Sequence, residues 1–90
     1  MRVKEHLVLR RIGSEYIIIV PDKDSVDLTE VYTLNETSAW IWEQLKGNDL
    51  TIEKLVELVR ESYDVDQETA TKDVLAIVDV FRSGGLIIED

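Results

Sequence analysis

The fold is decided by the stretch Leu34-Asn35-Glu36-Thr37-Ser38-Ala39-Trp40-Ile41-Trp42-Glu43-Gln44-Leu45. It lies between an alternating, β-branched sequence and a sequence with helical periodicity. Asn35 is a favourable N-cap, because its side-chain oxygen can accept a hydrogen bond from a free N–H of the first helical turn. Thr33 and Glu36 form an alternative capping box. Both tryptophans of the chain lie in this helix, and we expect their large rings to close a hydrophobic core.

The composition predicts one small globular domain. The chain has 90 residues, of which 44% are hydrophobic and 32% charged, in the range of ordinary globular domains. There is no cysteine, which excludes disulfides, thiolate metal sites and cysteine nucleophiles and favours a reducing compartment. No apolar run approaches the roughly 18–20 residues of a membrane span, and residues 1–6 do not resemble a signal peptide. We therefore expect a cytoplasmic protein with no membrane partner.

The charge is strongly negative and unevenly distributed. The formal net charge is −9; residues 1–11 carry +3, which leaves −12 on residues 12–90. Such an acidic body repels a phosphate backbone, whereas nucleic-acid binding needs a positive face. The sequence therefore argues against DNA or RNA as a partner.

Three strands are expected before the tryptophan helix, over residues 6–12, 15–20 and 28–34. Gly13-Ser14 supplies a tight turn between the first two. Residues 15–20 are apolar on both faces, as in a central strand. The third strand alternates: Leu28, Tyr32 and Leu34 share one face, which is typical of a half-buried strand at the edge of a sheet.

Three helices are expected next. The first ends before Gly47, Thr51 caps the second, and Asp64 or Asp66 caps the third. The third helix has a wide apolar stripe, which Leu75 and Val80 broaden on either side. The predicted fold is α+β and resembles a winged helix-turn-helix. It forms one domain, with a three-stranded antiparallel sheet (1–34), three helices (35–85) and a tail (86–90). The tail is either another strand or a packed extension.

The sequence offers little material for catalysis. His6 is the only histidine and has no nucleophile beside it in sequence. Asp22, Asp24 and Asp27 could suggest calcium, but the loop lacks the glycine and the terminal glutamate of an EF-hand. There is no glycine-rich phosphate loop. We expect no catalytic residues, no metal site and no cofactor.

Two features instead suggest binding of an extended peptide. The edge of the third strand can accept a peptide by β-augmentation, and the broad third helix could contact its side chains. Alternatively, Leu75 and Val80 belong to the core or to a homodimer contact.

The tryptophan stretch resembles the family of pyrroloquinoline quinone biosynthesis protein D (PqqD). Residues 34–42 are similar to its Leu-Asn-Glu-Thr-Ala-x-x-Ile-Trp pattern, with Ser38 in place of the usual alanine. The similarity covers residues 28–90 and continues through Gly47, Thr51-Ile52-Glu53, Tyr63-Asp64-Val65, Asp73-Val74-Leu75 and Gly84-Gly85-Leu86.

The resemblance implies a RiPP recognition element, a domain without catalytic activity that binds the leader of a ribosomally synthesised precursor peptide. The partner enzyme would be a radical S-adenosylmethionine enzyme or a leader peptidase. In that family the leader adds as a strand beside the third strand and packs on the third helix. Carried over by position, the resemblance implies backbone pairing at Glu30, Val31, Tyr32 and Thr33, and side-chain contacts at Val74, Leu75, Val78 and Arg82.

Two further expectations concern other partners. A winged-helix DNA-binding regulator is the alternative function, but the third helix (66–82) has a net charge of −2, whereas a DNA-reading helix should be basic. The second apolar face of the strand at 15–20 could meet a second copy of the chain or the partner enzyme.

Overall fold

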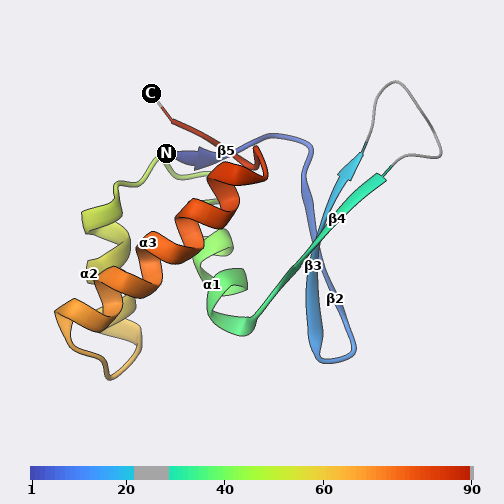
Figure 1. Cartoon of the computed structure of the whole chain (residues 1–90). Helices are drawn as coiled ribbons and strands as arrows, with labels where there is room; N and C mark the ends of the chain where they lie inside the picture. Colours follow the sequence, from blue (N-terminus) through green and yellow to red (C-terminus); the bar gives the residue numbers. More distant parts are fainter. Residues whose placement is uncertain (22–28, 90) are drawn as a thin grey trace.

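The computed structural model describes residues 1–21 and 29–89 (Figure 1). The acidic loop with Asp22, Asp24 and Asp27, and Leu28 at the expected start of the third strand, lie outside the described residues. The elements, in chain order, are β1 (Arg2–Val3), β2 (Val8–Ile12), β3 (Glu15–Pro21), β4 (Thr29–Leu34), α1 (Glu36–Leu45), α2 (Ile52–Ser62), α3 (Gln67–Ser83) and β5 (Ile87–Ile88).

The main sheet is antiparallel with the strand order β2-β3-β4. This confirms the central position of β3 and the edge position of β4. Ile18 pairs with Tyr32 and Tyr16 with Leu34, so these side chains share the inner face of the sheet. Gly13 lies in the tight turn with a φ of 63°, a backbone conformation that glycine adopts without strain.

A second, two-stranded sheet joins the two ends of the chain. β1 pairs antiparallel with β5, placing Val3 opposite Ile87, and the Lys4 N–H donates to the Leu86 carbonyl over 3.0 Å. The tail after α3 is thus a strand, one of the two alternatives that the sequence left open. Its partner at Arg2–Val3 was not expected, because two residues show no periodicity.

Each helix begins with a side-chain cap. The Ser38 N–H donates to Asn35 Oδ1 over 2.8 Å, which confirms Asn35 as the cap of α1. Thr51 caps α2 in the same way. For α3 the cap is Asp66 rather than Asp64.

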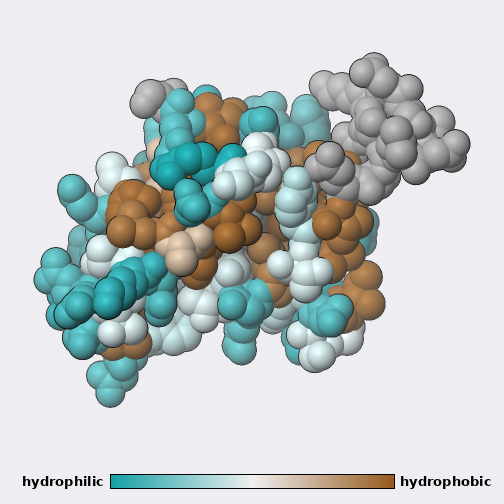
Figure 2. Space-filling model, viewed as in Figure 1, coloured by the Kyte–Doolittle hydropathy of each residue, from teal (hydrophilic) through white to brown (hydrophobic). Residues whose placement is uncertain are grey.

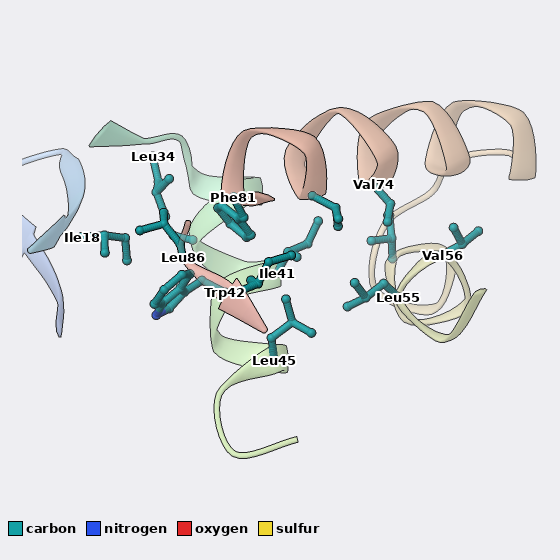
Figure 3. Packing of buried hydrophobic residues seen from close by; sticks show 14 of the residues in the cluster. Ile18, Leu34, Ile41, Trp42, Leu45, Leu55, Val56, Val74, Phe81 and Leu86 are labelled. Atoms are coloured by element: carbon teal, nitrogen blue, oxygen red, sulfur yellow. The ribbon is translucent and has the colours of Figure 1, made fainter. Parts of the chain in front are cut away.

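The core lies where α1 meets the sheet, α3 and β5. Trp42 is 1% exposed, and its ring meets Phe81 edge to face with centroids 5.4 Å apart. Figure 3 shows Trp42 between Ile18 of the sheet, Leu86 before β5 and Phe81 of α3. Trp42 therefore closes the core, as expected. Trp40 does not; it is only partly buried, and its ring packs edge to face on Tyr63 at 5.5 Å.

The observed architecture confirms the expected α+β fold. α1 lies between the three-stranded sheet and α2, and α3 packs across α2 (Figure 1). Within the part of the chain that the structure describes, no helix is both long and apolar enough to span a membrane.

Candidate functional site

The candidate site begins at the free edge of β4. Among the described residues, β4 pairs with β3 on one side and with nothing on the other. Leu34 is buried and Tyr32 partly buried on the inner face, whereas Val31 is 55% exposed and Thr33 is exposed on the outer face. β4 therefore has one covered face and one exposed face. The backbone N–H and C=O groups that point away from β3 can pair with another strand.

The residues that were expected on α3 lie in two different environments. Val74 and Val78 are 0% and 1% exposed, so their side chains fill the core and do not reach a surface ligand in this conformation. Leu75 is 50% exposed. The guanidinium of Arg82 is exposed and binds both carboxylate oxygens of Glu89, over 2.7 and 3.0 Å.

Arg82 and Leu75 share a flank of α3 that faces away from β4. They are seven residues apart and thus lie on the same side of the helix. Arg82 on this flank holds Glu89, which follows β5, and the Glu89 carboxylate raises the pKa of Arg82 while Arg82 lowers that of Glu89. This flank therefore faces the C-terminal strand.

The flank of α3 that faces β4 carries other residues. A hollow of about 280 Å³ lies between α3 and the junction of β4 with α1, lined by Asn35, Thr37, Asp73, Ala76 and Ile77. Val80 lies on the same flank, three residues after Ile77, and is 56% exposed. None of these residues is among the peptide contacts that the resemblance implied, and the sequence indicated Val80 only as one of two residues that broaden the apolar stripe.

A direct contact closes one end of this groove. The Tyr32 hydroxyl donates to the Gly84 carbonyl over 3.4 Å. A Cβ atom on Gly84 would come within 3.1 Å of the Tyr32 ring, so glycine permits this close approach of α3 to β4.

We call the surface between the edge of β4 (Val31, Thr33) and this flank of α3 (Asp73, Ala76, Ile77, Val80) the β4–α3 groove. In Figure 2 hydrophobic residues gather along α3 and over the sheet on either side of paler residues.

Fold and groove together define a class: a small α+β domain of winged-helix type whose open strand edge runs beside its last helix. The sequence model of one family, Coenzyme PQQ synthesis protein D (PqqD), matches residues 15–87. The chain therefore belongs to the PqqD family, which confirms the resemblance that its tryptophan stretch suggested.

Two solved structures have similar folds. The first is TbiB1 in complex with the TbiA(beta) leader peptide, with a TM-score of 0.73, 18% identity and complete coverage of both chains. The second is lasso peptide synthetase B1 complexed with the leader peptide, with a TM-score of 0.72, 17% identity and coverage of 98% of this chain and 96% of that one. No significant match was found among curated protein sequences.

Proposed function

We propose that this protein is a RiPP recognition element that binds the leader of a precursor peptide in the β4–α3 groove. The observation that carries the proposal is the open edge of β4 beside the hollow on α3. Membership of the PqqD family, a family of RiPP recognition elements, supports it. So does the likeness in fold to two proteins solved with leader peptides.

The strand register identifies the backbone groups that would pair with the leader. Residue pairs of an antiparallel ladder alternate between hydrogen-bonded and non-hydrogen-bonded. Ile12 and Glu15 close the two-residue Gly13-Ser14 turn, so we take their pair as hydrogen-bonded. By alternation, Ile18 directs its N–H and C=O toward β4 rather than toward β2.

The same alternation sorts the residues of β4. Tyr32 faces Ile18 and uses its backbone groups in the β3–β4 ladder, as does Glu30 two residues earlier. Val31 and Thr33 then direct their N–H and C=O away from the sheet. We therefore infer that, of the four residues 30–33, Val31 and Thr33 form the hydrogen bonds to the leader.

On the helix side, we infer contacts at Ala76, Ile77 and Val80. These side chains lie on the flank that faces β4, whereas Val74 and Val78, which the resemblance implies as contacts, have side chains buried in the core. Apolar leader side chains that alternate along the added strand would point at this flank.

A titration with the precursor leader encoded beside this protein's gene tests the groove. In ¹⁵N-labelled protein, we expect the amides of residues 31–34 and 76–80 to shift most. Affinity should be on the order of micromolar or tighter, since ordering an extended peptide costs entropy. Movement confined to other parts of the chain would contradict the groove assignment.

The Val31→Pro variant tests the backbone pairing. Proline removes one outward N–H, and an edge strand tolerates it where that N–H faces solvent. We expect affinity for the leader to fall about 3- to 10-fold, the contribution of one hydrogen bond. The control is Val31→Ala, which keeps the N–H and should bind within about 2-fold of the original protein. Equal losses in both variants would assign the effect to the side chain.

Membership of the PqqD family also supports a finer proposal. We propose that the protein itself performs no chemistry and presents the leader to a modifying enzyme, either a radical S-adenosylmethionine enzyme or a leader peptidase. Reconstitution with each enzyme encoded nearby separates the two: only the true partner should process the precursor faster when this protein is added. Val31→Pro should reduce that stimulation in proportion to its loss of leader binding.

A further inference from the structure

A second hollow lies outside the β4–α3 groove. It has a volume of about 250 Å³ and is lined by Leu9, Tyr16, Glu36, Ala39, Trp40, Glu43 and Tyr63. It shares no lining residue with the groove: Asn35 and Thr37 of the α1 start line the groove, whereas Glu36, Trp40 and Glu43 line this hollow. We call it the aromatic–carboxylate pocket.

Three aromatic rings contribute to its wall. Trp40 meets Tyr63 edge to face, and Tyr63 is 36% exposed, so these rings stay accessible. The guanidinium of Arg11 lies 5.7 Å from the centroid of the Tyr16 ring. The faces of such rings attract cations, and tryptophan does so most strongly.

Two carboxylates stand beside the rings. Glu36, Trp40 and Glu43 follow the i, i+4, i+7 spacing and so share one flank of α1. Among the residues that the structure describes, neither glutamate forms an ion pair. The pocket thus combines aromatic surface with two carboxylates that form no ion pair among the described residues, beside the guanidinium of Arg11 over the Tyr16 ring.

An acidic surface continues from this pocket. Tyr63 also lines a larger, open hollow of about 740 Å³ along α2 and the turn after it. Its charged residues are Glu53, Glu57, Glu61 and Asp64 against Arg60, and Lys54 offsets Glu57 over 3.6 Å. A small cation would fill only the aromatic pocket, whereas a basic protein segment would use both hollows.

We propose that the aromatic–carboxylate pocket binds an arginine side chain within a basic segment of a partner protein. A guanidinium is planar, stacks on aromatic rings and can bind a carboxylate with two hydrogen bonds, so it matches both parts of the wall. Because this site and the β4–α3 groove share no lining residue, the protein can hold a peptide and a second protein together.

A pair of short peptides tests the chemistry. One is acetyl-Ser-Arg-Gly-Lys-Ser-amide, and the other carries citrulline, the neutral isostere, in place of arginine. With ¹⁵N-labelled protein we expect the arginine peptide to shift the Trp40 indole N–H and the amides of residues 61–64, with a Kd on the order of millimolar. The citrulline peptide should leave them in place. Equal shifts from both peptides, or no shift at Trp40, would overturn the proposal.

Matched variants separate the pocket from general electrostatics. Glu43→Gln should weaken binding of the arginine peptide about 3- to 10-fold through loss of a charged partner. Glu68→Gln makes the same charge change on α3, where Glu68 pairs with Lys72 over 3.4 Å, and should leave binding unchanged. Equal losses in the two variants would overturn the proposal.

Two more measurements complete the test. Trp40→Leu, with circular dichroism to confirm its fold, should weaken the arginine peptide about 3- to 30-fold. A saturating leader peptide should leave the Trp40 shift intact; displacement would mean that the two peptides share one site and would overturn the proposal. The peptide pair, Glu43→Gln and Trp40→Leu do not involve the leader, so their results do not depend on the proposed function; only the displacement measurement does.

Discussion

At the scale of single residues, the two tryptophans of α1 have different roles although they are only two residues apart. Trp42 points into the core against Phe81, whereas Trp40 lies on the opposite flank against Tyr63. Two residues along a helix correspond to about 200°, so the two rings cannot face the same neighbours. Trp42 therefore supports the fold, and Trp40 is left to form part of a surface.

This difference predicts unequal losses of stability. Trp42→Ala should lower the free energy of unfolding by about 3–5 kcal/mol, because it leaves a large cavity in a sealed core. Trp40→Ala removes a partly buried ring and should cost less, about 1–2 kcal/mol. Urea denaturation followed by far-ultraviolet circular dichroism measures both. Similar losses would contradict the assignment of the rings.

The cap at Asn35 gives a second test at this scale. Asn35→Ala removes the acceptor for the Ser38 N–H and should cost about 1 kcal/mol of unfolding free energy. Asn35→Asp keeps an acceptor at the same position and should stay close to the original stability. If Thr33 and Glu36 formed the true cap, Asn35→Ala would cost nothing measurable.

At the scale of elements, the sequence predicts long segments and their order well, because periodicity and capping residues are local. The three main strands and the three helices lie within about two residues of their expected bounds, apart from the start of the third strand, which lies outside the described residues. The flank of α3 that faces β4 was not predictable. The stripe widens at both Leu75 and Val80, and only the way α3 packs on the other elements decides that Val80 lies toward β4.

The start of α3 predicts a pH dependence. The Thr69 N–H donates to Asp66 Oδ1 over 2.7 Å and lowers the pKa of Asp66 below its usual 3.8. The folded state therefore favours the charged carboxylate, so its contribution is complete above the unfolded pKa and is lost as the pH falls through the lower folded pKa. Asp66→Asn keeps a capping oxygen that does not titrate.

We therefore expect the free energy of unfolding to fall less for Asp66→Asn than for the original protein between about pH 5 and pH 2. A carboxyl with a lowered pKa titrates over roughly this range. Urea midpoints at several pH values measure the difference. Asp49 and Glu89 also have lowered pKa values, but they are unchanged in the variant and cancel in the comparison. Parallel pH profiles would show that the cap does not depend on the charge.

At the scale of the whole molecule, no helix or strand among the described residues covers the outer face of the three-stranded sheet. α1 and Trp42 cover the inner face, while the outer face presents Val8, Ile12 and Val31 at 40%, 62% and 55% exposure. The register places Val8, Ile19 and Val31 in one row across the three strands. A row of this kind is an apolar surface that a second copy of the chain could bury.

We predict that the free protein forms a dimer through this face at high concentration. Its net charge of −9 opposes association, so added salt should raise the dimer fraction by screening the repulsion. Sedimentation velocity over a range of concentrations, at low and high salt, measures this. Ile12→Lys should abolish the dimer by placing a charge on the outer face, where Ile12 is 62% exposed. The control is Leu75→Lys, which makes the same charge change at a 50% exposed residue of α3 and should dimerise normally. A monomer under all conditions would leave the sheet face to a different partner.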